Sequence, residues 1–234
     1  MKRSFVILCS ILCVAFWLRY ANLTDNPPGF FCDEASVGYN AYSILHTGKD
    51  QFGTPFPLFF QAFGEYKNPV DIYFTVPFIA VFGLSEFSVR FSSVFISLLT
   101  IIALFILGTR IHSSSLGLCI ATLFAITPWS IHLSRTNMEG LQHFLLFTTI
   151  SLVALTKNEM HKYRLLVFAV CAAIATYCYF PARIIMPLFV MGICIWKIKN
   201  HKTKHLGIAM VLYCLCIIPL GIHMLHGGMS RWNQ

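Results

Sequence analysis

The apolar residues of this chain are grouped into long runs that are separated by short polar stretches. A helix that crosses a bilayer needs about 20 mostly apolar residues, so this pattern predicts membrane-spanning helices. The runs that approach this length are 5–18, 91–109, 116–133, 141–156, 165–180, 184–196 and 206–224. The predicted fold is therefore an all-α polytopic membrane protein with about seven transmembrane helices. The first and sixth runs are short and need flanking residues to complete a span.

The segment between the first two spans, residues 22–84, is far longer than the usual connection of about 4–6 residues. It is rich in Phe and Tyr, whose rings favour the membrane interface. The apolar periodicity predicts a helix over 35–46, with Asp33 as its cap and Glu34 in its first turn. Residues 49–64 are predicted to be extended.

A polar turn is predicted at residues 65–69, followed by a second apolar stretch at 70–84. This stretch has only 15 residues and contains Pro77. We expect it to lie in the membrane interface rather than to form an eighth span. The long first loop is therefore predicted to carry interfacial helices.

Composition agrees with a membrane location, because 57% of the residues are hydrophobic and 11% are charged. A soluble domain has about 25% charged residues, so a soluble globular fold is excluded. The net charge of +8 is a topology signal: with the N-terminus in the cytoplasm, ten of the 17 Lys and Arg lie inside, four of them lysines in 197–205. Eight of the nine acids then lie outside. We expect a multi-pass cell-membrane protein whose loop 22–84 faces outward, and no nucleic-acid partner.

The N-terminal run has two interpretations, a cleaved signal peptide or an uncleaved anchor. No small-residue cleavage site follows it, which favours the anchor. Eight of the nine cysteines lie in the predicted spans, with only Cys32 in the outer loop. This distribution predicts no disulfide framework, and the spacing of Cys and His is not that of a metal site.

The adjacent acids Asp33 and Glu34 are the first candidates for chemistry at the outer face. A carboxylate there can accept a proton from a hydroxyl, and the pair would be the ligands if a divalent cation binds. No cofactor is required by the pattern. A helix cap is the competing interpretation, and the spacing alone favours it.

Lys67 is the one basic residue between Lys49 and Arg90. Its ammonium suits a phosphate as a point charge, although snorkelling to lipid headgroups explains its position equally well. Arg135 and Glu139 lie at the outer ends of the third and fourth spans, where they either pair with each other or face the same cavity.

An ordered set of short motifs resembles a known enzyme class. The motifs are Cys32-Asp33-Glu34-Ala35, Tyr39-Asn40-Ala41, Glu65-Tyr66-Lys67-Asn68-Pro69 and Phe82-Gly83-Leu84-Ser85-Glu86-Phe87-Ser88-Val89-Arg90. In this order they resemble the polyprenyl-phosphate-dependent membrane glycosyltransferases of the GT-C class, of the protein O-mannosyltransferase and lipid A aminoarabinose transferase type. The resemblance covers most of the chain and is most specific in residues 30–90.

The resemblance implies inverting transfer of a sugar from a polyprenyl-phosphate carrier to a protein, lipid or glycan acceptor at the outer membrane face. It assigns Asp33 as the catalytic carboxylate and Glu34 as its support. Lys67 would contact the carrier phosphate. The remaining candidates for substrate binding are Glu65, Tyr66, Arg90, Arg135 and Glu139.

Members of this class usually continue beyond their seventh helix, whereas this chain ends at Gln234, so residues 1–234 are expected to be the N-terminal transmembrane module of a truncated protein. Two alternatives remain at this stage. One is a transporter or lipid-carrier flippase, which is expected to carry ionisable residues near mid-membrane. The other is an inactive truncated relative.

Overall fold

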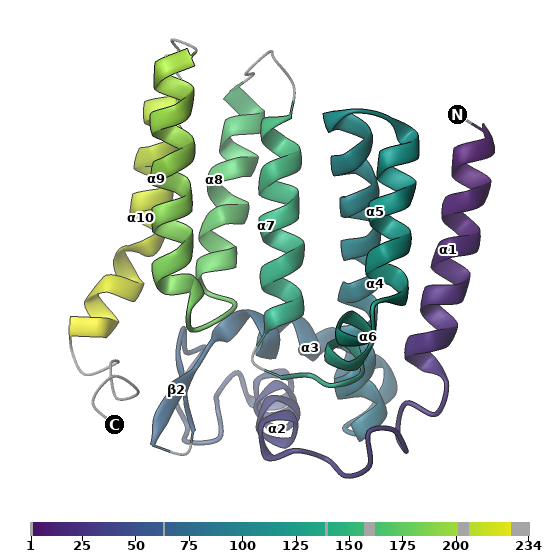
Figure 1. The fold of residues 1–234 in the computed structure, drawn as a ribbon. Coiled ribbons are helices and arrows are strands. Elements are labelled where there is room, and N and C mark those ends of the chain that lie inside the picture. The colour runs from purple at the N-terminus through teal and green to yellow at the C-terminus, as the bar shows by residue number, and fades with distance from the viewer. Residues whose placement is uncertain (1, 63, 139, 157–161, 201–205, 226–234) are drawn as a thin grey trace.

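The computed structural model describes residues 2–62, 64–138, 140–156, 162–200 and 206–225. Its elements are α1 (Lys2–Tyr20), α2 (Cys32–Thr47), β1 (Phe60–Ala62), β2 (Glu65–Lys67), α3 (Pro69–Phe82), α4 (Glu86–Ile111), α5 (Ser114–Ile126), α6 (Pro128–Arg135), α7 (Leu141–Leu155), α8 (Lys162–Thr176), α9 (Ala182–Asn200) and α10 (Leu206–Leu225). Figure 1 shows α1, α4, α5, α7, α8, α9 and α10 lying alongside one another. The helices α2, α3 and α6 and the β hairpin gather at one end, away from the N-terminus.

Small residues allow the long helices to pack closely. Helix α4 packs against α5 and α7, and α8 packs against α7, α9 and α10. A Cβ atom added to Gly108 of α4 would lie 2.7 Å from the Cα of Gly117 in α5, so the two backbones touch. Helix α8 presents buried alanines, Ala169, Ala172 and Ala173, to its neighbours. Contacts between small residues are typical of helices that associate within membranes.

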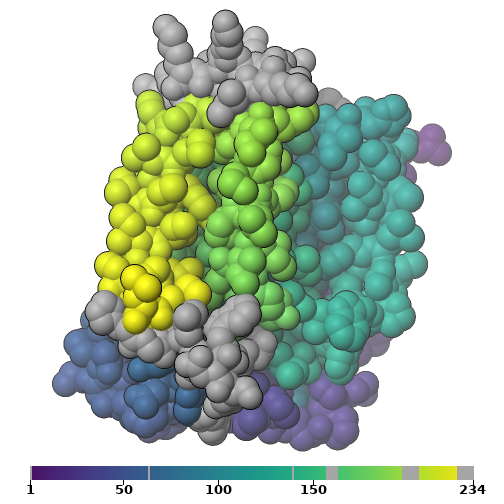
Figure 2. All heavy atoms as spheres, turned by 60° about the vertical axis from the view of Figure 1, so that its left-hand side comes forward, coloured from purple at the N-terminus to yellow at the C-terminus, as the bar shows by residue number. Residues whose placement is uncertain are grey.

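The outer surface of the bundle is apolar. Figure 2 shows α9 and α10 side by side on one face, and large hydrophobic side chains such as Leu188 and Leu215 are exposed on them. Among the described residues, α1, α4 and α10 are each long and apolar enough to cross a membrane. Helices α3, α7, α8 and α9 contain shorter apolar stretches. The chain is therefore an all-α membrane protein, and the number of seven spans stays a prediction.

The predicted third span, 116–133, is not one straight helix. It is divided into α5 and α6, which meet at an angle of 60°. Pro128 causes the break, because it has no N–H to donate and it forces the preceding Thr127 into an extended conformation. The helix carbonyls left free at the break are those of Phe124 and Ala125, and both accept hydrogen bonds from the guanidinium of Arg19.

The long first loop contains more regular structure than the sequence indicates. Helix α2 begins at Cys32, three residues before the predicted start, and its N-cap is Phe31 rather than Asp33. The strands β1 and β2 pair as an antiparallel hairpin within the region predicted to be extended or turned. Helix α3 then begins at Pro69, which is well suited to a first helical position. Packing among the loop elements explains these differences, because Val37, Phe60 and Ile72 share one buried cluster.

Candidate active site

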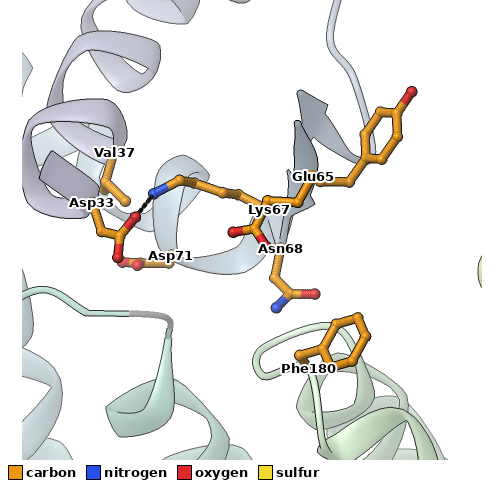
Figure 3. A pocket seen from close by; sticks show the side chains of 8 residues that line it. Asp33, Val37, Glu65, Lys67, Asn68, Asp71 and Phe180 are labelled. Carbon is orange, nitrogen blue, oxygen red and sulfur yellow. Dashed lines mark hydrogen bonds and ion pairs between the residues drawn. The ribbon is translucent and has the colours of Figure 1, made fainter. Parts of the chain in front are cut away.

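A small polar pocket lies where α2, β2 and α3 meet, at the end of the bundle away from the N-terminus (Figure 3). Its volume is about 30 Å³, which admits water but not a sugar. The residues that line it are Asp33, Val37, Glu65, Tyr66, Lys67, Asn68, Asp71 and Phe180. Three acids and one lysine therefore face a single space, and all four come from the long loop between the first two predicted spans.

Local structure explains why these groups converge. Asp33 lies in the first turn of α2. In the hairpin, Lys67 is opposite Phe60 and Glu65 is opposite Ala62. Because side chains alternate along a strand, Glu65 and Lys67 lie on one side of β2 and Tyr66 on the other. Asn68 then serves as the N-cap of α3, so the lysine and the first turn of this helix are adjacent in the chain.

Lys67 and Asp33, the two residues assigned to the carrier phosphate and to catalysis, are in direct contact. The Nζ atom of Lys67 donates to Oδ1 of Asp33 at 2.5 Å (Figure 3). The side chains are 12% and 20% exposed, respectively, so the ion pair is largely shielded from solvent. In this state each group is held by the other, and the pair crosses the pocket.

Glu34 points away from this pair, although it is the neighbour of Asp33 in the sequence. Its Oε1 accepts from Nε of Arg90 at 3.0 Å and from the backbone N–H of Asn137 at 3.2 Å. Its Oε2 accepts from Nη2 of Arg90 at 3.2 Å and from the backbone N–H of Phe31 at 3.1 Å. Each carboxylate oxygen of Glu34 therefore accepts two hydrogen bonds from other groups of the protein, in a buried contact that supports the fold.

This placement also separates the two candidate metal ligands. Asp33 faces the pocket, whereas Glu34 is buried against Arg90. Within the part of the chain that the structure describes, no group of three or more His, Cys, Asp or Glu is arranged to hold a metal ion.

Arg90 binds protein groups rather than facing the pocket. Besides Glu34, its guanidinium donates to the backbone carbonyls of Leu23, Thr24, Pro27 and Gly29. Arg90 thus pairs with Glu34, which lies beside it in three dimensions, although Glu86 precedes it by one helical turn in the sequence. Arg90 therefore fastens the polar stretch that leads into α2.

Arg135, like Arg90, binds backbone carbonyls, and it holds the C-terminal end of α1. Its guanidinium donates to the carbonyls of Leu18, Arg19, Ala21, Asn22 and Asn26. The predicted pairing of Arg135 with Glu139 falls on a residue outside the described part of the chain. Neither Arg90 nor Arg135 lines the pocket.

Tyr66 and Glu65 both line the pocket. The ring of Tyr66 lies edge-on to His223 of α10, with centroids 4.6 Å apart. His223 in turn stacks on Phe59 at 3.9 Å. The hairpin is thus fixed to the end of α10 by aromatic contacts.

The sequence did not single out Asp71, and it did not indicate the contact between Asn68 and Arg183. Asp71 lines the pocket from the first turn of α3, and Asn68 accepts a hydrogen bond from Arg183 of α9 at 3.0 Å. The guanidinium of Arg183 lies 4.7 Å from the ring centre of Phe180. Asp71 had a visible signal, because it is the lone charged residue in the apolar stretch 70–84. The contact of Asn68 with Arg183 joins residues 115 positions apart, so no local pattern predicts it.

An apolar groove of about 490 Å³ lies next to the pocket, within the range of about 300–1,000 Å³ that is usual for ligand sites. It is lined by Leu58, Pro69, Val70, Tyr73, Phe74, Phe147, Val170, Ala173, Ile174, Tyr177 and Cys216. Pro69 and Val70 line this groove, and their neighbours in the chain, Asn68 and Asp71, line the pocket, so the two spaces meet at the first turn of α3.

Fold and site together define a class of protein: a helical membrane protein with a charged pocket beside an apolar groove at one end of the bundle. Residues 66–223, more than half of the chain, match the family model of the dolichyl-phosphate-mannose-protein mannosyltransferases. The chain therefore belongs to the dolichyl-phosphate-mannose-protein mannosyltransferase family. No curated protein and no solved structure matches it at a significant level.

The family match supports the resemblance that the motifs indicate at the level of a membrane mannosyltransferase-like enzyme. The matched region begins at Tyr66, so Lys67, Arg90 and Arg135 lie inside it, whereas Asp33 and Glu34 precede it. It does not separate the protein O-mannosyltransferase type from the aminoarabinose transferase type.

Proposed function

We propose that this protein transfers a sugar, mannose or a close relative, from a polyprenyl-phosphate carrier to a hydroxyl-bearing acceptor at the outer face of the membrane. The observation that carries the proposal is the Lys67–Asp33 pair in a pocket that meets an apolar groove. A cation next to an apolar surface suits a phosphate that bears a hydrocarbon chain. Membership of the mannosyltransferase family supports the same donor class.

Lys67 is proposed to bind the phosphate of the donor. When the bond between the sugar C1 and the phosphate oxygen breaks, negative charge grows on that oxygen, and a fixed ammonium stabilises it without reorganising. Because Lys67 is held by Asp33 before substrate binds, the phosphate must compete with this carboxylate. Binding of the donor therefore also releases Asp33.

Asp33 is proposed to act as the general base. It takes the proton of the acceptor hydroxyl while the acceptor oxygen forms the new bond to C1 and the carrier phosphate leaves. A single displacement of this kind inverts the configuration at C1. Glu34 is assigned a positioning role, because its oxygens hold Arg90 and the start of α2 rather than face the pocket.

The outer location follows from the distribution of positive charge. Helix α1 begins, and α4 ends, at the end of the bundle away from α2 (Figure 1). Lys2, Arg3 and Arg110 are therefore opposite the pocket. Since Lys and Arg concentrate on the cytoplasmic side of membrane proteins, the pocket is proposed to face outward.

The test uses Lys67→Ala, Lys67→Arg and Lys67→Glu in membranes supplied with a radiolabelled short prenyl-phosphate mannose. Lys67→Ala should lower transfer by about 10²–10³-fold, the usual cost of losing one stabilising donor at a developing charge. Lys67→Glu should be worse, because it repels the phosphate. Lys67→Arg should recover only part of the rate, because its planar fork replaces a compact ammonium.

Lys49→Ala is the matched control, since Lys49 is an exposed lysine of the same loop that does not line the pocket. It should transfer sugar at the unmodified rate. If all three Lys67 variants transfer sugar at the rate of the unmodified protein, after correction for the amount of folded protein, Lys67 does not bind the phosphate and the proposed function fails.

A further inference from the structure

Asp71 is a buried carboxyl whose surroundings do not use all of its hydrogen-bonding capacity. It lies in the first turn of α3, is 3% exposed and lines the pocket. Its Oδ1 atom is buried without a hydrogen-bond partner among the described residues. Leaving a buried polar atom unsatisfied costs about 1–3 kcal/mol, so such an atom in a pocket indicates a partner that arrives with a ligand.

The charge of the pocket limits what that ligand can be. The titratable or charged groups of the described chain that surround Asp71 are Asp33 of α2, Glu65 and Lys67 of β2, Cys178 beyond α8, and Arg183 of α9, which holds Asn68. With Asp71 ionised, three carboxylates would face an incoming phosphate, and Lys67 is the one cation among the described residues that line the pocket. With Asp71 neutral, the pocket is less negative and gains an O–H donor.

Burial raises the pKa of Asp71 to about 7, against the lowering effects of Lys67, of the Asn137 side chain and of the Gly140 backbone. Asp33 raises it further, because two neighbouring carboxylates disfavour a second negative charge. Asp71 is therefore mainly protonated below pH 7 and mainly ionised above it.

We propose that Asp71 is a donor-binding residue that acts as the neutral acid, donating a hydrogen bond from its free carboxyl oxygen to a phosphate oxygen of a prenyl phosphodiester held by Lys67. This inference rests on the proposed function, and it adds Asp71 to Lys67 as a second group that binds the phosphate of the donor. Lys67 supplies the positive charge, and Asp71 supplies a neutral donor on another side of the pocket. Donor binding should then weaken as the pH rises and Asp71 loses its proton.

The test measures binding of a short prenyl phosphate methyl diester to the purified full chain in detergent, by calorimetry. A diester keeps one negative charge across neutral pH, whereas a phosphate monoester itself titrates near pH 6 and would confuse the result. With one linked proton and a pKa of about 7, the Kd should rise by about tenfold between pH 6 and pH 8.

Asp71→Asn keeps the shape and the hydrogen-bond donor but cannot ionise, so its Kd should be the same at both pH values and close to that of the unmodified protein at the lower one. Glu65→Gln is the matched control, because it removes the charge of another carboxyl that lines the same pocket and is less buried than Asp71. This variant should keep the tenfold pH dependence. Prenyl alcohol, which has no phosphate, should show no pH dependence with any variant.

The outcomes separate the two proposals. If the diester does not bind at either pH, or if Lys67→Ala binds it as well as the unmodified protein does, the proposed function fails. If binding depends on Lys67 but not on pH, the role of Asp71 is refuted while the proposed function stands. The pH profile of the unmodified protein gives this answer even if Asp71→Asn does not fold. Pronounced pH dependence that persists in Asp71→Asn would equally refute the role.

Discussion

Two clusters of charged residues lie at the same end of this molecule and use their hydrogen bonds in opposite ways. In the arginine network, formed by Arg90, Arg135 and Glu34, the side chains bind one another or backbone carbonyls between α1 and α2. In the pocket, Lys67 and Asp33 pair with each other, and Oδ1 of Asp71 has no hydrogen-bond partner within the described part of the chain.

The difference separates charge that holds the fold from charge that is available to a ligand. Buried charges that are fully hydrogen-bonded are costly to break and have no capacity left for a substrate. Groups that keep unused capacity at a pocket are candidates for chemistry. Asp33 and Glu34 fall on opposite sides of this division, although they are adjacent in the sequence.

The largest expected effect is that of Asp33→Asn on catalysis. The change removes the proposed base but keeps the shape of the side chain, so transfer should fall by about 10²–10⁴-fold. Thermal unfolding in detergent should change little, because Asp33 is partly exposed. Radiolabelled sugar transfer in membranes measures the loss. Unchanged turnover would show that Asp33 is not the base and serves only as an acidic residue in the first turn of α2.

Arg90→Ala tests the arginine network and should affect folding first. It leaves Glu34 as a buried carboxylate without its main partner, and breaking such a pair costs roughly 3–5 kcal/mol. We expect a large drop in the unfolding temperature or in the yield of folded protein. Glu86→Gln, an exposed change on the same helix, is the control and should be neutral. A folded, stable Arg90→Ala protein that has lost only transfer would place Arg90 in the binding site instead.

A smaller effect is expected at Gly140, which precedes α7 and influences the carboxyl of Asp71. Its φ of +67° disfavours any other residue, and an added Cβ would lie 2.3 Å from the carbonyl oxygen of Cys178. Gly64 has a φ of +82° with nothing within 4 Å of an added Cβ, so Gly64→Ala isolates the backbone cost of about 1–2 kcal/mol.

Gly140→Ala should therefore lower the unfolding temperature more than Gly64→Ala does, and it should also weaken binding of the prenyl phosphodiester. Equal stability of the two variants would show that the backbone near Cys178 yields easily and that Gly140 is needed only for its φ.

The mildest test labels existing cysteines and changes no residue. Cys32 is exposed beside Asp33, whereas Cys178 is buried next to the pocket. An impermeant thiol reagent should label Cys32 in intact cells, because the pocket is proposed to face outward, and it should not label Cys178. Mass spectrometry of the labelled peptides reads out both sites. Labelling of Cys32 only after the membrane is disrupted would place the pocket on the inner side.

Much of this architecture was accessible from local patterns. Apolar runs predict the long helices, and Ser85, a residue type suited to a helix start, is the N-cap of α4, where its hydroxyl accepts from the N–H of Ser88. The motif around Lys67 indicated a site in the loop 22–84, and several residues of this loop line the small polar pocket. These features depend on residues close together in the chain, so periodicity and spacing are sufficient to find them.

The partners of the buried arginines could not be predicted from local sequence patterns. Arg19 directly follows the first predicted span, 5–18, yet it is fully buried and donates to the carbonyls exposed by the break at Pro128. Arg135 was expected near a substrate and instead binds the carbonyls at the end of α1. Both outcomes depend on partners more than 100 positions away, which spacing does not reveal.

The sequence by itself determined that this is a helical membrane protein, that six of its nine acids lie in the long loop 22–84, and that Asp33 and Lys67 are its leading candidates. Hydrophobic run length and motif order carry that information. Only the tertiary structure decided that Asp33 meets Lys67 while Glu34 meets Arg90, and that Asp71 shares the pocket. The physical reason is that neighbours in a helical turn point in different directions, so their partners are chosen by packing between distant segments.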